Sequence, residues 1–339
     1  HSKFSNTMAI GVAVGDSPTG PFKDAIGRPL YEGSWDFIDP TVFVDDDGQA
    51  YLYWGNPNVY YAKLNADMVS LDGEVSKVEQ TIESFGSPGP DKREKGKKYK
   101  DIYTEGPWLH KRGGTYYLSY AAGGVPEHIA YSMSDTPTGP WKYMGEIMPL
   151  QDTGSFTNHC GVTDYKGNSY FFYHTGKLPG GGGFGRSVAV EQFSYNPDGT
   201  FPIINATTEG VSPVGTLTPY QRVEAETIAF SEGVKSEWNA KTGVYVSGIH
   251  DGDYIKVREV DFEDLSPKCL CVSVASALRG GWIEIRTDSI GGTLIAEMRV
   301  PHTGGWECWT SIEADVTVPV TGVHDVYFVF KGRKGCELF

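Results

Sequence analysis

The sequence predicts an all-β protein in which a β-propeller is followed by a β-sandwich (jelly roll). Hairpin signals recur at residues 45–48, 111–114 and 164–168, each time between two apolar runs. A second motif, residues 16–22, returns almost unchanged at residues 135–141. Repetition at a spacing of roughly 50–65 residues, with several strands in each unit, is typical of propeller blades.

Each hairpin is expected to form the inner part of one blade. In chain order these blades are residues 36–65, 103–143 and 155–195. A strand expected at residues 8–14 precedes them and closes a further blade. Residues 66–101 form a longer excursion that ends in a basic run at 92–100, which we interpret as a solvated loop.

The strand pattern changes around residues 210–218, so we divide the chain into units of residues 1–215 and 216–339. A length of 339 residues also favours two domains. The second unit has short alternating strands at 252–257, 282–286 and 325–330, a spacing typical of a sandwich.

Composition narrows the possible partners and compartments. The net charge of −14 argues against nucleic acid, because phosphate binding needs clustered cations. No apolar stretch approaches the length of a membrane span. Five cysteines without framework spacing fit reduced thiols slightly better than disulfides, which leans towards a reducing compartment. No signal peptide is visible, but the chain opens in the middle of a pattern, so both cytoplasmic and secreted locations stay open.

Two acidic residues stand at the beginnings of expected inner strands. Asp39 precedes Pro40, which should hold Asp39 extended, and it lies near Trp35 and Phe37, whose rings suit sugar binding. Glu105 leads the next inner strand. A lone Asp-Pro is more often a turn cap, but a propeller brings the leading residues of its inner strands to one central place. We therefore expect the two carboxyl groups to meet there.

The motifs resemble two known families. Residues 1 to about 210 resemble glycoside hydrolase family 43, five-bladed propellers that remove arabinofuranosyl or xylosyl groups from plant polysaccharides. Residues from about 220 resemble a family 6 carbohydrate-binding module. The first resemblance rests on Ile38-Asp39-Pro40, Thr104-Glu105-Gly106-Pro107, Asn158-His159, Tyr173-His174 and Arg186-Ser187-Val188. The second rests on Val223-Glu224-Ala225-Glu226, Gly252-Asp253-Tyr254 and Thr303-Gly304-Gly305-Trp306.

The resemblance implies an inverting exo-glycosidase, an arabinofuranosidase or xylosidase acting on plant cell-wall polysaccharide or oligosaccharide. Glu105 would be the general acid, and Asp39 would tune its pKa as a neighbouring charge. We expect burial and Asp39 to raise the pKa of Glu105.

The resemblance also assigns sugar contacts and calcium. His159 and Arg186 would line the sugar site together with Trp35 and Phe37. His174 would lie on the propeller axis and hold a structural calcium ion with water, although a satisfied core histidine is the simpler reading of that residue alone. Glu224 and Glu226 would be available for a structural calcium ion in the second unit.

The sequence departs from the family patterns in two ways. No residue matches the catalytic base, since Asp16 and Asp36 lie near the right region in the wrong motif. We therefore expect roughly 100 residues of the propeller to be missing. Either a second chain or segment supplies them, or the sequence omits residues present in the real protein, and residues 1–339 alone should be unstable and inactive. In the second unit Gly248 replaces the usual sugar-stacking aromatic and leaves Trp306 to act alone, so we expect weak sugar binding there.

Two other functions remain open at this point. A non-catalytic carbohydrate-binding protein would share the aromatic residues but would not need a pair of carboxyl groups. A structural propeller that docks protein partners would instead expose apolar patches on its rim.

Overall fold

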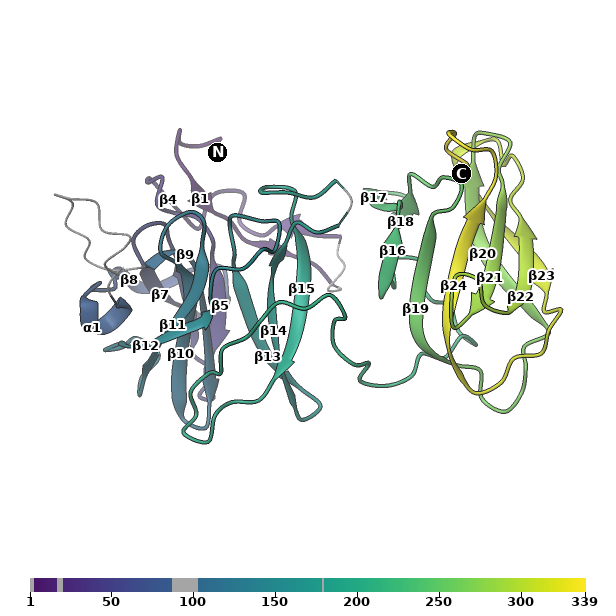
Figure 1. Ribbon diagram of the computed structural model, residues 1–339. Coiled ribbons are helices and arrows are strands. Elements are labelled where there is room, and N and C mark those ends of the chain that lie inside the picture. The colour runs from purple at the N-terminus through teal and green to yellow at the C-terminus, as the bar shows by residue number, and fades with distance from the viewer. Residues whose placement is uncertain (1–2, 17–20, 87–102, 179) are drawn as a thin grey trace. The chain divides into compact units, whose positions relative to one another are not determined.

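The computed structural model describes residues 3–16, 21–86, 103–178 and 180–339. The chain divides into two compact units, His1–Val211 and Ser212–Phe339 (Figure 1). Apart from one short helix, α1 (Ile82–Phe85), the regular structure of the described residues is β-sheet, which confirms the all-β prediction. The basic run at 92–100 lies outside the described residues.

The first unit contains three antiparallel sheets in which each strand pairs with the next along the chain. The strands of the first sheet are β5 (Thr41–Val44), β6 (Ala50–Trp54), β7 (Tyr60–Leu64) and β8 (Leu71–Lys77). Those of the second are β9 (Tyr103–Arg112), β10 (Thr115–Ala122), β11 (His128–Ser134) and β12 (Lys142–Met148). Those of the third are β13 (Cys160–Tyr165), β14 (Asn168–Thr175) and β15 (Ser187–Phe193). The three predicted inner hairpins are therefore confirmed as β5–β6, β9–β10 and β13–β14.

Two small sheets precede these blades. They pair β1 (Ala9–Ile10) with β4 (Tyr31–Glu32) and β2 (Ala13–Val14) with β3 (Lys23–Asp24).

The blades pack face to face through a strand that is buried on both sides. In β10, Tyr116, Leu118 and Tyr120 join a core with the first sheet, while Tyr117 and Ala121 join a core with the third. This explains why β10 is apolar almost throughout, since successive side chains point to opposite faces and both faces are covered. As a result the inner strands are neighbours: β5 contacts β9, and β9 contacts β13 (Figure 1).

The second unit is a sandwich around one core. A five-stranded sheet has the order β16-β19-β24-β21-β22, and β20 pairs with β23. Residues of both layers share the hydrophobic core, among them Ile255, Ile283, Val274 and Ile312. The strands are β16 (Phe230–Glu232), β17 (Lys235–Asn239), β18 (Gly243–Ser247), β19 (Tyr254–Asp261), β20 (Cys269–Ser276), β21 (Trp282–Thr287), β22 (Leu294–Arg299), β23 (Gly305–Asp315) and β24 (Val323–Lys331).

Candidate active site

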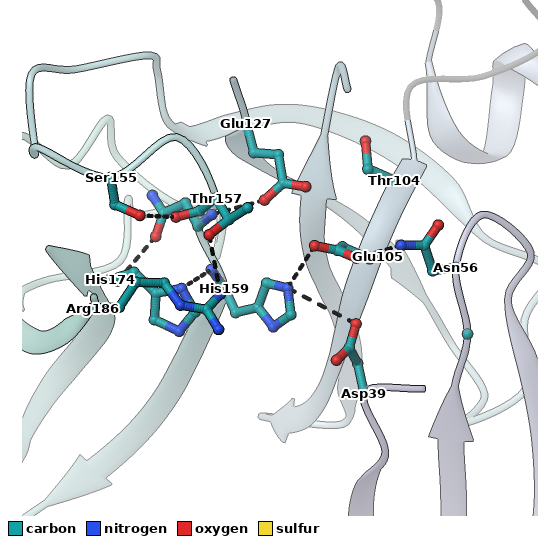
Figure 2. A network of polar contacts seen from close by, with 12 residues as sticks. Asp39, Asn56, Thr104, Glu105, Glu127, Ser155, Thr157, His159, His174 and Arg186 are labelled. Atoms are coloured by element: carbon teal, nitrogen blue, oxygen red, sulfur yellow. Dashed lines mark hydrogen bonds and ion pairs between the residues drawn. The ribbon is translucent and has the colours of Figure 1, made fainter. Parts of the chain in front are cut away.

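Three neighbouring inner strands each contribute one side chain to a common cluster. Asp39 lies just before β5, Glu105 lies near the start of β9, and His159 directly precedes β13. The Nε2 atom of His159 lies 3.1 Å from Oε1 of Glu105 and 3.9 Å from Oδ2 of Asp39 (Figure 2). Asp39 and Glu105 thus meet at one imidazole ring.

Asp39 adopts a backbone conformation that the sequence analysis did not expect. Its φ angle is 59°, in the left-handed region, so the prediction that Pro40 would hold it extended is wrong. Aspartate tolerates this region better than most residues because its short side chain can hydrogen-bond locally. Unusual backbone angles cluster at functional sites, where the surrounding structure maintains them.

Glu105 is turned into the cluster by an irregularity in β9. The pairing of β9 with β10 is irregular here: Ser119 pairs with Trp108, and Ala121 pairs with Glu105. Two steps along β10 therefore face three steps along β9. A bulge of this kind re-aims side chains beside active sites. The carboxylate of Glu105 then accepts hydrogen bonds from Asn56 Nδ2 and from the ring of His159.

These hydrogen bonds reverse the expected electrostatics of Glu105. The hydrogen bond from His159 lowers the pKa of Glu105 below its ordinary value, and it outweighs burial, which raises it. The prediction of a raised pKa for Glu105 was therefore wrong, because hydrogen bonds to the charged form stabilise that form. It is Asp39 whose pKa is raised, first by burial and then by the charge of Glu105, against the opposing charges of His159 and Arg186.

His159 is the positive partner of the cluster. Burial lowers its pKa, but the hydrogen bond to Glu105 and the charges of Asp39, Glu105 and Glu127 outweigh burial and raise it overall. The raised pKa favours the protonated imidazole, whose charge offsets that of the surrounding carboxyl groups.

Glu127 is a site residue that the sequence analysis missed. It is 5% exposed, and its Oε2 atom accepts a hydrogen bond of 2.7 Å from the backbone N–H of Asn158 (Figure 2). Burial raises the pKa of Glu127 to about 7, and the nearby charge of Glu105 contributes to the increase. Glu127 directly follows the Gly123-Gly124-Val125-Pro126 turn between β10 and β11, and its place after this turn was the available clue.

His174 and Arg186 lie beside the cluster. The ring of His174 stacks on His159 with centroids 5.1 Å apart, and its Nδ1 atom accepts the His159 backbone N–H at 3.3 Å. Burial, together with the charges of His159 and Arg186, lowers the pKa of His174 to about 4. Arg186 donates from Nη1 to Thr157 Oγ1 at 3.0 Å. His174 is therefore a neutral support for His159, and Arg186 is a cation at the edge of the site.

The two aromatic residues near Asp39 have different environments. Trp35 is 54% exposed, so its ring offers a surface to a ligand. Phe37 is 8% exposed and packs against Tyr31, Tyr60 and Trp54, with ring centroids 4.7 Å, 5.4 Å and 6.3 Å away. The assignment of Phe37 to sugar binding is corrected accordingly: its ring belongs to the hydrophobic core.

Two sets of side chains in the first unit hold groups that can bind metal ions. Ligand atoms of Asp39, Glu105 and His159 lie within 4.8 Å of one another, the one such group among the described His, Cys, Asp and Glu residues. We do not assign these residues to a metal, because His159 and Asn56 already hydrogen-bond to Glu105. His174 lies outside this group and has committed Nδ1 to a hydrogen bond. Since calcium prefers oxygen ligands, His174 is a poor fit for a strong calcium site.

The expected calcium ligands of the second unit do not fit either. Arg222 binds both carboxylate oxygens of Glu224, with contacts of 2.7 Å from Nε and 2.8 Å from Nη2. Glu224 is therefore engaged in an ion pair with Arg222, and Glu226 is a half-buried turn residue beside it.

The expected sugar surface of the second unit is only partly present. Trp306, in β23, is 46% exposed. Gly248 has a φ angle of 65°, a conformation that an aromatic residue rarely adopts. An aromatic side chain at this position would therefore strain the backbone.

Cleavage of a glycosidic bond needs a carboxyl group that can hold a proton close to a carboxyl group that is ionised. The pKa of Glu127 is raised and that of Glu105 is lowered, and Asp39 approaches the same Nε2 atom of His159 as Glu105 does. The class of protein that this fold and this site define is a glycosidase.

Comparisons with known proteins agree. Residues 1–201 match the sequence model of glycosyl hydrolases family 43, and residues 224–339 match that of the family 6 carbohydrate binding module. An arabinoxylan arabinofuranohydrolase of Bacillus subtilis (strain 168) is 35% identical over 376 residues, covering 97% of this chain and 68% of that protein. One of Paenibacillus polymyxa is 33% identical over 380 residues, covering 99% of this chain and 56% of that protein. The chain belongs to family 43 of the glycosyl hydrolases.

A solved structure extends this similarity to three dimensions. The crystal structure of a family 43 arabinoxylan arabinofuranohydrolase from Bacillus subtilis, in complex with cellotetraose, has a TM-score of 0.79 and 34% identity. It matches 97% of this chain, which in turn spans 72% of that chain. These relatives are enzymes, so the alternative of a non-catalytic carbohydrate-binding protein is not favoured. The expected second chain that completes the propeller finds no support in these comparisons.

Within the described part of the chain, no helix is both long enough and apolar enough to cross a membrane.

Proposed function

We propose that the protein is an inverting exo-glycosidase that removes arabinofuranosyl or xylosyl residues from arabinoxylan-type polysaccharides and oligosaccharides. The observation that carries the proposal is the convergence of Asp39 and Glu105 on the ring of His159. The similarity to two arabinoxylan arabinofuranohydrolases supports the choice of substrate.

In this proposal Glu105 protonates the leaving oxygen of the scissile bond. Asn56 and His159 hold its carboxyl group from two sides, which fixes its direction before the substrate arrives. Asp39 approaches the same Nε2 atom of His159 as Glu105 does, and it acts through charge, because its carboxylate raises the pKa of His159. In this proposal Glu105 donates the proton, and Asp39 acts only through its charge.

Arg186 and Trp35 are the residues that we assign to substrate contacts. The guanidinium group of Arg186 is anchored by Thr157 and keeps further donors for sugar hydroxyl groups. The exposed ring of Trp35 suits stacking on the apolar face of a sugar. Hydrogen bonds from Arg186 would orient the sugar, and stacking on Trp35 would bury apolar surface.

The test is the release of free pentose by the intact parent protein. Arabinoxylan, para-nitrophenyl arabinofuranoside and para-nitrophenyl xyloside are compared at equal enzyme concentration. Arabinose or xylose should appear as the monosaccharide, and proton NMR should show the inverted anomer first. Binding of arabinoxylan without release of any sugar would instead support the carbohydrate-binding alternative.

A further inference from the structure

Glu127 connects two segments that meet at the site. It lies between β10 and β11, and its backbone N–H donates to the carbonyl of Phe156 at 3.0 Å. Its Oε2 atom accepts the backbone N–H of Asn158 at 2.7 Å. Because His159 follows Asn158 directly, these two bonds fix the backbone from which His159 reaches Glu105.

The second oxygen of Glu127 has a different environment. Oε1 is buried and has no hydrogen-bond donor among the described residues. Figure 2 shows the carboxyl groups of Glu127 and Glu105 side by side, and Glu105 contributes to the raised pKa of Glu127. Ionised carboxylates only accept hydrogen bonds, so a hydrogen bond between these two groups would require a proton on one of them.

The surroundings decide which group carries the proton. Glu105 receives hydrogen bonds from His159 and Asn56, and its pKa is lowered mainly by His159. Glu127 is buried and receives one backbone N–H, and burial raises its pKa to about 7. Below that pH the proton therefore belongs to Glu127 while Glu105 is ionised.

We propose that Glu127 is a positioning residue that fixes His159 through Asn158 and shares one proton with Glu105. This inference rests on the proposed role of Glu105 as proton donor. The proton passes from Oε1 of Glu127 to the Glu105 carboxylate, which leaves Glu127 ionised. Glu105 gives this proton to the glycosidic oxygen as the C–O bond breaks and its electron pair moves to that oxygen. Water adds hydroxide to the sugar and releases one proton, and a proton from solvent returns to the pair.

The first test replaces Glu127 by glutamine. The amide oxygen of Glu127→Gln can still accept the Asn158 N–H, but the side chain no longer holds an acidic proton. The groups that face residue 127, namely Glu105, His159 and Asn158, are unchanged, as are Asp39 and Arg186 beyond them. The alkaline limb of kcat/KM on arabinoxylan oligosaccharides should move to lower pH by about one unit, with about a tenfold loss near pH 7.

A matched control is Glu146→Gln, which alters a 44% exposed carboxylate on the same sheet and should leave the pH profile in place. An unshifted profile in Glu127→Gln, with equal losses on oligosaccharides and nitrophenyl glycosides, would overturn the shared proton.

The second test needs no substrate. Infrared titration of the protonated carboxyl band should show a group that titrates near pH 7 in the wild type. The band should be absent in Glu127→Gln, and in Glu105→Gln it should titrate at lower pH, because the negative neighbour has gone. Its unchanged presence in Glu127→Gln overturns the inference, and if that variant does not fold, the Glu105→Gln titration decides. A wild type that shows the band but releases no sugar would contradict the proposed function instead.

Discussion

Gly106 lies against the imidazole ring of His159, where a β-carbon would come within 2.8 Å of the ring's Cγ atom. The φ angle of Gly106 is 60°, which favours glycine in any case. The residue that follows the proposed acid therefore has to be small so that His159 can approach that acid.

Gly106→Ala should displace His159 from Glu105 and reduce kcat/KM by at least about tenfold, since small misplacements at a site are costly. Gly113→Ala is the matched control, because its φ angle is 56° and a β-carbon there meets nothing within 4 Å. Both variants should lose about 1 kcal/mol of stability from the left-handed backbone. Measurements of Tm and kcat/KM separate the two effects, and equal activity losses would contradict the steric explanation.

Glu105→Gln should lower kcat by about 10²–10⁴-fold on substrates whose leaving oxygen needs a proton. Nitrophenyl glycosides should lose much less, because nitrophenolate leaves without protonation. The comparison uses one enzyme preparation and both substrate types. A single modest factor for both would show that Glu105 is not the proton donor.

Trp35 and Phe37 should respond to alanine in opposite ways. Phe37→Ala removes a buried ring and should cost about 3–5 kcal/mol of unfolding free energy, measured by denaturant titration. Trp35→Ala should leave stability nearly unchanged and raise KM for arabinoxylan, because its ring is exposed. A stable Phe37→Ala variant with a raised KM would show that Phe37 contacts the sugar after all.

Chelation should have only a partial effect on the protein. One imidazole with waters makes a weak calcium site, so EDTA should lower Tm or activity slightly, with recovery on adding calcium. The control is His174→Gln, which should abolish the EDTA effect if the ion binds there. A protein whose Tm and activity are both unaffected by EDTA has no functional calcium ion at His174.

The second unit should bind xylo-oligosaccharides weakly through the surface around Trp306. Stacking on aromatic faces supplies much of the affinity for sugars, and Gly248 has no ring to offer. Calorimetry on the whole chain and on Trp306→Ala measures this contribution. Tight binding that disappears in the variant would show that one aromatic residue is sufficient.

Local signals in the sequence predicted the fold well. Gly48 and Gly114 mark turns, with φ angles of 84° and 86°, and the hairpins formed where these residues predicted them. Turn chemistry acts over a few residues, so a single sequence contains it.

The site was predicted less completely, because its electrostatics depend on distant parts of the chain. Glu105 and Asp39 were identified by their places at the beginnings of inner strands. The pKa of Glu105 depends on His159, 54 residues later, and the importance of Glu127 depends on Asn158, 31 residues later. The environment of Phe37 likewise depends on Tyr60 and Tyr31, which lie outside the motif around Asp39.

The cluster takes Glu105 from β9, and Asp39 and His159 from the residues that lead into β5 and β13. Each sheet can form by local pairing, but the acid is held correctly only when all three have docked. Enzymatic activity is therefore a sensitive measure of whether the three sheets have docked. In mild denaturant, activity should therefore be lost at a lower denaturant concentration than β-strand content. The protein hydrolyses polysaccharide only when its sheets are packed together.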